Sequence, residues 1–180
     1  MDANPRRVVT GHSADGKSVI VSDGPSPRHI TITGMTGFSI TGVWATDHGM
    51  TALPGSDDPT HRMTTLVPGD GGTRFLVTVI PPPGPMPPAD ELAAAGPQML
   101  ERLPGLAQAM EPGHPGMHTT DTVDYDIVIS GELVMELDDG AEVTLKPGAI
   151  VVQNGTRHAW RNRGTEPVVM YSVLVGAPRR

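Results

Sequence analysis

The stretch that decides the fold is KPGAIVVQNGTRHAWRN, residues 146–162. Two segments, 149–153 and 158–162, flank the tetrapeptide Asn-Gly-Thr-Arg at 154–157. Asn-Gly between two such segments indicates a β-hairpin, because both residue types tolerate the left-handed backbone of a tight turn. The stretch therefore predicts two antiparallel strands joined by a short turn.

The segments on either side of this hairpin also have the pattern of strands. Segment 132–137 places Leu or Met at every second position with Glu between them, and 142–146 alternates Val and Leu with Glu, Thr and Lys. The two are joined by Asp-Asp-Gly at 138–140. This alternation is typical of antiparallel strands with one buried and one wet face. Segment 168–175 is nearly all apolar, which indicates a strand covered on both faces.

The N-terminal region, residues 1–80, also consists of short strand candidates separated by turns. A hairpin is predicted around Asp15-Gly16, and a long loop with little periodicity over 46–70. Six or seven short strands at close spacing are typical of a sandwich or a barrel. The strand candidates in this region are Arg6–Thr10, Lys17–Val21, His29–Thr33, Phe38–Ala45 and Arg74–Ile80.

Residues 81–112 differ in character from the rest of the chain. A stiff Pro-rich linker over 81–88 precedes two predicted helices. The first covers Asp90–Ala95, and the second begins at Pro97, because Pro suits the first position of a helix. Pro104 and the Gly after it should kink or split the second helix. We expect this segment to cover one end of the barrel, either as a packed flap or as a lid over a substrate.

The composition bounds the class of protein. The chain of 180 residues fits one domain, and its 22 Gly and 19 Pro favour a turn-rich β protein. Thirteen basic against 20 acidic residues give a net charge of −7, which argues against nucleic acid or an anionic membrane as a partner. The absence of cysteine excludes disulfides and thiolate catalysis. Residues 1–7 contain no apolar stretch of the signal-peptide kind, so we expect a cytoplasmic protein.

Two short motifs in residues 113–176 resemble those of the cupin superfamily, in its single-cupin, RmlC-like form. The second motif is close to complete, whereas the first is degenerate, with Thr120 where a second His is usual and Asp124 where Glu is usual. The resemblance implies an all-β fold, a double-stranded β-helix or jelly-roll barrel, with the two motifs on facing strands. The matching positions are Gly113, His118, Thr120, Asp124 and Gly131 in the first motif and Pro147, Gly148, His158 and Asn162 in the second.

The resemblance also organises the rest of the chain. We expect one domain over 1–180, with 113–177 as the core that carries the motifs and 81–112 as the linker and short helices. The N-terminal strands and loops, 1–80, then pack on the barrel or are exchanged with a second chain. Because cupins commonly dimerise by exchanging N-terminal strands, and a long exposed strand edge is an aggregation hazard, we expect a homodimer.

A metal site is the main functional expectation from the resemblance. Carried over residue by residue, the family pattern gives His118, Asp124 and His158 as ligands of one divalent ion. Two imidazoles and one carboxylate form a facial set that leaves open positions for water, substrate or oxygen. By ligand type the set suits Fe, Mn, Ni or Zn. Asp124 has a second possible role without a metal, as the acceptor of a hydrogen bond from Thr120 or His118.

Several neighbouring residues are candidates for binding a substrate. Thr120 shares a face with His118, and Trp160 shares one with His158, because side chains alternate along a strand. Trp160 is then either a core wall or a flat pocket floor. We expect Asp126 on a bulge facing water; facing inward, it would stand ~6.6 Å from Asp124 along one strand, close enough for the two carboxylates to repel.

The remaining substrate-binding candidate is a charged one. Arg157 either caps its hairpin or, beside the mouth of a pocket, suits an anionic substrate.

These residues leave three functions open. The first is a cupin-type enzyme acting on a small carbonyl-bearing metabolite, a metal-assisted lyase, dehydratase or isomerase in which Asp124 or His118 moves the proton. The second is a non-haem Fe(II) dioxygenase, which the same facial set permits. The third is a non-catalytic cupin that binds a small ligand. All three place a small molecule in the barrel.

Overall fold

The computed structural model describes residues 4–50 and 58–179. The loop predicted over 46–70 is therefore described only in part, and the first three residues of the N-terminal stretch lie outside the described residues. The strands are β1 (Arg6–His12), β2 (Ser18–Pro25), β3 (Arg28–Thr31), β4 (Ser39–Thr46), β5 (Thr73–Ile80), β6 (Thr122–Ser130), β7 (Leu133–Glu136), β8 (Glu142–Leu145), β9 (Ile150–Asn154), β10 (Ala159–Arg161) and β11 (Val168–Gly176). The helices are α1 (Ala89–Arg102) and α2 (Leu106–Ala109), with short 3₁₀ turns η1 (Pro59–Arg62) and η2 (Asp138–Gly140).

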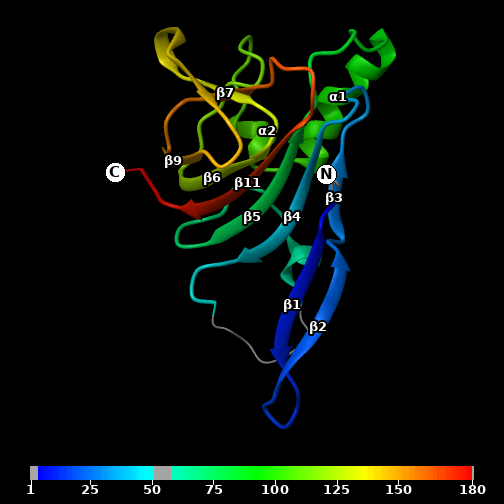
Figure 1. Cartoon of the computed structure of the whole chain (residues 1–180), viewed down its shortest axis with the longest axis vertical. Helices are drawn as coiled ribbons and strands as arrows, with labels where there is room; N and C mark the ends of the chain where they lie inside the picture. Colours follow the sequence, from blue (N-terminus) through cyan, green and yellow to red (C-terminus); the bar gives the residue numbers. More distant parts are fainter. Residues whose placement is uncertain (1–3, 51–57, 180) are drawn as a thin grey trace.

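Two antiparallel sheets form the barrel. The larger has the order β3-β4-β5-β11-β6-β9 and the smaller β10-β7-β8 (Figure 1). The apolar strand predicted over 168–175 is β11, which pairs with β5 on one side and β6 on the other. The hairpin predicted around 154–157 joins β9 to β10, which lie in different sheets. The predicted all-β jelly-roll fold is confirmed.

The N-terminal strands divide into two groups. Strands β3, β4 and β5 are half of the six-stranded sheet, so the barrel is wider than the predicted core of 113–177. Strands β1 and β2 form a separate hairpin, which Figure 1 shows extending away from the barrel. Arg7 fastens this hairpin to the barrel: its guanidinium donates to the carbonyl of Val43 at 3.0 Å and to Asp58 at 2.5 Å.

The helical segment departs from the prediction in one respect. The break expected between Ala95 and Pro97 is absent, and α1 runs through both residues to Arg102. A Pro inside a helix costs one backbone hydrogen bond. Packing offsets that cost, because Ala95 is buried in the same cluster as the barrel strands. The predicted split at Pro104 is confirmed, since Gly105, with a φ of 83°, separates α1 from α2.

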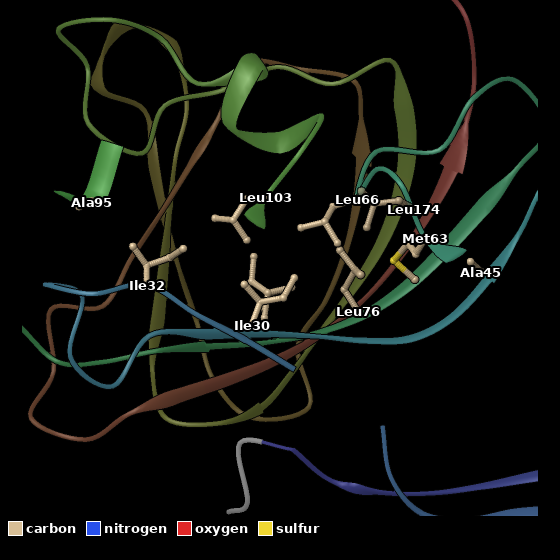
Figure 2. Packing of buried hydrophobic residues seen from close by; sticks show 10 residues of the cluster. Ile30, Ile32, Ala45, Met63, Leu66, Leu76, Ala95, Leu103 and Leu174 are labelled. Carbon is tan, nitrogen blue, oxygen red and sulfur yellow. The ribbon is translucent and has the colours of Figure 1, made fainter. Parts of the chain in front are cut away.

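Two apolar clusters fill the barrel. The first joins strands β3, β4, β5 and β11 to α1 and to Leu66 and Leu103, and Figure 2 shows these side chains pointing toward one another inside the ring of strands. The second lies between β6, β7, β8 and β11, around Leu133 and Val168. Among the described residues, no helix is long and apolar enough to cross a membrane.

Candidate functional site

A cavity of about 1290 Å³ opens inside the barrel. Its wall draws on both apolar clusters and on strands β4, β5, β6, β10 and β11. Every residue of the Pro-rich segment 81–88, which we call the strap, lines the cavity. Met99 of α1 and Leu106 of α2 line it as well. The helical segment therefore lines a pocket, as the lid alternative requires. Sites for small molecules are typically concave and mostly apolar with a few polar groups, as this one is.

Two imidazoles stand side by side in the cavity wall. His118 and His158 exchange two backbone hydrogen bonds, of 2.9 and 3.0 Å, in an isolated antiparallel bridge. Their ring centroids are 4.2 Å apart, and both side chains are buried. The Trp160 ring packs edge-on against His158 at 5.3 Å and also lines the cavity. The structure thus brings together the two histidines and the tryptophan that the motifs singled out.

Burial keeps both imidazoles neutral, against backbone hydrogen bonds that favour the charged form. The Nδ1 atom of His118 donates to the carbonyl of Gly116 at 3.0 Å, which leaves Nε2 unprotonated. Burial lowers the pKa of His118. Burial also lowers the pKa of His158 to about 4, with a further contribution from the charge of His118. Near neutral pH the pair therefore carries no charge.

Gln153 fixes the second imidazole from behind. Its Oε1 accepts from the backbone N–H of Thr156 at 2.9 Å and from the hydroxyl of the same residue at 3.1 Å. Its Nε2 donates to the Thr156 carbonyl at 2.8 Å and also faces Nδ1 of His158. Nδ1 of His158 lies 3.0 Å from the same carbonyl. Nδ1 of His158 therefore lies between an amide donor and a carbonyl acceptor, and the tautomer of the ring decides which of the two it pairs with.

Two buried carboxyl groups line the same cavity. Asp124 and Asp126 lie on one face of β6, and Asp126 accepts a hydrogen bond of 2.6 Å from the hydroxyl of Ser172 on β11. The expectation that Asp126 faces water on a bulge is wrong, because β6 pairs regularly with β11 at this point and turns the side chain inward. Asp124 Oδ1 and Asp126 Oδ2 are buried without a hydrogen-bond partner among the described residues.

Burial shifts the pKa of both carboxyl groups upward. The pKa of Asp124 rises to about 7, mainly through desolvation, with a smaller contribution from the charge of Asp126 and an opposing hydrogen bond from Thr122. The pKa of Asp126 rises to about 6, again through desolvation, against the hydrogen bond from Ser172. These carboxyl groups therefore change protonation near neutral pH, as acid–base groups must.

The remaining candidates fall on both sides of the cavity wall. Thr120 lines the cavity, and its hydroxyl lies 2.8 Å from that of Thr122. The partner proposed for Asp124 without a metal was Thr120 or His118, but the hydrogen bond that acts on its pKa comes from Thr122.

Arg157 does not face the cavity. Its guanidinium binds Glu111 through two hydrogen bonds of 2.7 and 2.8 Å and Asp138 through one of 2.9 Å. The role considered for Arg157 in binding an anionic substrate stays a prediction, and these carboxylates already occupy its donors. The residue instead fastens the segment after α2 to the β9–β10 turn and to η2.

The described residues do not gather the predicted metal ligands. Across 4–50 and 58–179, no three His, Asp or Glu side chains are grouped so that they could hold a metal ion. His118 has the arrangement of a ligand, because its Nδ1 bond leaves Nε2 free. Asp124 does not join the two imidazoles in such a group, so the three-ligand site of His118, Asp124 and His158 is not assembled and remains a prediction.

The sequence analysis missed three parts of the site. Ser172 and Gln153 support Asp126 and His158, and the strap supplies one wall. Ser172 sits in an apolar strand 46 residues from Asp126, so only the pairing of β6 with β11 reveals it. Gln153 had a weaker signal, because it directly precedes the turn that leads to His158. The six prolines among the eight residues of the strap indicated a stiff segment, but they did not show that it lines a cavity.

Comparison with known proteins agrees with this architecture. Residues 107–174 match the family model described as Cupin domain. The matched segment contains both imidazoles, both carboxyl groups and Trp160, which stand at the cavity. Residues 107–174 therefore form a cupin domain, with the second motif nearly complete and the first degenerate.

Individual relatives are similar over very different lengths. "Phomopsin biosynthesis cluster protein C'" of Diaporthe leptostromiformis is 47% identical over 51 residues, 28% of this chain and 27% of that protein. "Cupin-domain-containing oxidoreductase fogC" of Aspergillus ruber is 27% identical over 172 residues, 94% of this chain and 71% of that protein. A solved RmlC-like cupin family protein with a double-stranded β-helix fold, from Methanocaldococcus jannaschii, has a TM-score of 0.39 at 16% identity over 61% of this chain and 75% of that chain. The 51 residues shared with the Diaporthe leptostromiformis protein thus span about a quarter of the length of that protein.

Proposed function

We propose that this chain is an acid–base enzyme that moves a proton on a carbonyl-bearing organic molecule bound in the barrel cavity. One observation carries the proposal. Two buried carboxyl groups whose pKa values lie at about 7 and about 6 share one apolar cavity with two neutral imidazoles. Acid–base catalysis is most efficient when the pKa of the catalytic group lies near the working pH. This set of groups suits an isomerase, a lyase or a dehydratase.

Each group has a role in this proposal. Asp124, as the carboxylate, removes a proton from the carbon next to the carbonyl through its unpartnered Oδ1. In the tautomer with its proton on Nε2, His158 donates a hydrogen bond to the carbonyl oxygen as negative charge develops there. Asp126 is held by Ser172 and adjusts the pKa of Asp124 by its charge. Returning the proton to another carbon completes an isomerisation. In a dehydration, the protonated Asp124 instead gives the proton to a hydroxyl on the neighbouring carbon, whose C–O bond breaks to release water.

A second candidate is an oxidoreductase, a metal-dependent one such as a non-haem Fe(II) dioxygenase. The observation that favours it is the similarity over 94% of this chain to a protein named as a cupin-domain-containing oxidoreductase. A divalent ion (Fe, Mn, Ni or Zn) would be held first by His118, whose free Nε2 is suited to it, and by His158. When bound, such an ion supplies Lewis-acid or redox chemistry at the polar end of the cavity.

One experiment separates the two candidates. Carbonyl compounds are incubated with the protein in deuterated water, and deuterium at the carbon next to the carbonyl is followed by NMR alongside dioxygen uptake. The acid–base proposal expects deuterium exchange without dioxygen uptake, lowered by about 10²–10⁴ in Asp124→Asn. Stoichiometric dioxygen uptake would replace it with the oxidoreductase.

Elemental analysis supplies the matching control. Metal content near one ion per chain that falls in both His118→Ala and His158→Ala supports the metal-dependent candidate. Asp126→Asn, which keeps the hydrogen bond to Ser172 within reach, should lower the exchange rate far less than Asp124→Asn. Binding of a carbonyl compound without exchange or oxidation would leave a non-catalytic ligand-binding cupin.

A further inference from the structure

The cavity extends well beyond the groups that carry the proposed chemistry. We infer that it takes an elongated, mostly apolar organic molecule with one neutral oxygen-bearing group, a carbonyl or hydroxyl, placed against Asp124 and the two imidazoles. The apolar remainder lies along the barrel axis toward the strap. This inference rests on the proposed function, because it assigns a class of substrate to the same site.

The length of the cavity can be estimated along strand β11. At one end Leu174 pairs with Asp124, and at the other Val168 pairs with Ile80, the last residue before the strap. Both Asp124 and Ile80 line the cavity. Leu174 and Val168 are six residues apart, or about 20 Å at the ~3.3 Å rise of a strand. A molecule that touches both ends is therefore long compared with a small metabolite.

The polarity of the wall falls steadily along this axis. Next to Asp124 comes the pair of Asp126 and Ser172, joined by their hydrogen bond. The following row across the sheet holds Met170 opposite Thr78, with a single hydroxyl. Beyond it lie Ile80 and the strap. A ligand that matches this wall carries its polar group at one end only.

The far end of the cavity is built for hydrocarbon. Six of the eight strap residues are Pro, whose rings have no hydrogen-bond donor. Met99 of α1 also lines the cavity, and Met side chains adapt to irregular apolar shapes. The volume of about 1290 Å³ exceeds the ~300–1,000 Å³ typical of pockets for drug-sized ligands.

The charges at the cavity favour a neutral ligand. Arg161 is paired with Glu136 at 2.7 Å and Glu111 with Arg157 at 2.7 Å. Glu91, just after the strap, adds a further carboxylate to the lining, which also disfavours an anionic ligand. At the polar end, Asp124 holds an unpartnered buried oxygen and would repel a carboxylate. A carbonyl or hydroxyl oxygen instead pairs with the protonated carboxyl group or the imidazole N–H.

A homologous series of ligands tests the inference. Straight-chain methyl ketones of increasing length are titrated into the full chain carrying Trp44→Phe, so that the fluorescence of Trp160 reports binding in the cavity. Each added methylene should tighten binding about fourfold, the equivalent of about 0.8 kcal/mol per buried CH₂, until the chain fills the cavity. Further methylenes should then add nothing. The carboxylates of equal length should bind at least tenfold more weakly.

Variants at the far end locate the tail. Ile80→Phe should weaken only the longest ketones by about tenfold, whereas Ile80→Ala should move the optimum to a longer chain. Because the two changes predict opposite shifts, poor folding of one still leaves the other as a test. Val152→Phe, which adds a ring on the exposed outer face of β9, is the matched control and should leave the series unchanged.

The outcomes separate this inference from the proposed function. Affinity that does not change with chain length, or carboxylates or amines that bind more tightly than ketones, would overturn the inference, while deuterium exchange on a short ketone would keep the proposed function. Length-dependent binding that persists in Asp124→Asn, with no exchange in the parent, would support the inference and reject the acid–base chemistry.

Discussion

The segment that matches the family and the segment before it divide the work of the site. Residues 107–174 supply the imidazoles, the carboxyl groups and Trp160. Residues 4–50 and 58–106 supply β4, β5, the strap and the helices, which form much of the apolar wall. The chemistry therefore comes from the part that resembles other cupins, and the shape available to a ligand comes largely from the other. The comparison teaches that a family match identifies the reactive groups before it identifies the molecule they act on.

The largest expected effect tests whether residues 107–174 fold independently of the residues that precede them. Leu103 lies before that segment and is 1% exposed, within the cluster that joins α1 to β4, β5 and β11. Leu103→Ala should lower the free energy of unfolding of the whole chain by about 2–5 kcal/mol, because it leaves a cavity under the site strands. Urea unfolding followed by far-UV circular dichroism and by Trp160 fluorescence measures it.

The matched control is Leu100→Ala on the same helix, where the side chain is 56% exposed. It should cost less than about 1 kcal/mol. If Leu103→Ala unfolds the N-terminal part while Trp160 keeps its native fluorescence at the same urea concentration, the two regions are independent. Coincident transitions by both probes indicate one cooperative unit.

A smaller effect is expected from Asp124, one of the reactive groups, on the stability of the folded chain. The pKa of Asp124 is raised by burial to about 7 in the folded chain, from the ordinary value of 3.8. The folded state therefore binds a proton more tightly than the unfolded state, and stability falls as pH rises from about 4 to about 7. Asp124→Asn cannot ionise, so its Tm should exceed that of the parent by at least about 2–4 °C above pH 7, the shift for about 1 kcal/mol.

The pH profile of that difference is the decisive readout. The Tm advantage of Asp124→Asn should shrink toward zero as pH falls below about 4, where Asp124 becomes protonated in both states. Asp70→Asn, at an exposed position, should give a difference that does not change over the same range. An advantage for Asp124→Asn that is constant with pH, or absent at pH 8, contradicts the buried ionisable role assigned to this residue.

Local signals predicted the parts of the fold that depend on neighbouring residues. The turn between β9 and β10 and the strands β7 and β8 follow from turn chemistry and a period of two, although β9 and β10 lie in different sheets and do not pair with each other. The helix that runs through Pro97 did not follow, because packing against the barrel outweighs a local breaker. The type of most elements was thus readable, but β6, which carries Asp124 and Asp126, was not among the predicted strand segments, and the ends and partners of the elements were not readable.

The site divides in the same way. His118 and His158 were found because motif spacing is a local property. Asp126 was placed toward water, since its inward orientation depends on the pairing of β6 with Ser172 in β11. Arg157 was assigned to a substrate because nothing local reveals Glu111, 46 residues earlier in the chain, as its partner. The orientation of Asp126 and the partner of Arg157 both depend on contacts between residues far apart in the chain. Such contacts cannot be predicted from the local pattern of a single sequence.

The smallest expected effect on the fold concerns the hairpin of β1 and β2. Val8 is 50% exposed and Ile20 is 65% exposed, and the hairpin pairs with no other strand among the described residues. The homodimer predicted from the sequence remains a prediction, and this hairpin is the natural surface on which to test it. Exposed apolar side chains contribute little to the stability of the chain that carries them.

Replacing Val8 and Ile20 together by Ser should therefore leave the Tm within about 2 °C, while converting a dimer to a monomer. Light scattering after size exclusion, at several protein concentrations, measures the mass. Leu92→Ser with Leu100→Ser on α1 is the matched control, because these side chains are also about half exposed but lie on the barrel. A parent that stays monomeric at every concentration removes the dimer. A dimer that the control abolishes and the hairpin variant keeps would place the contact at the helical segment, and with it the mouth of the cavity.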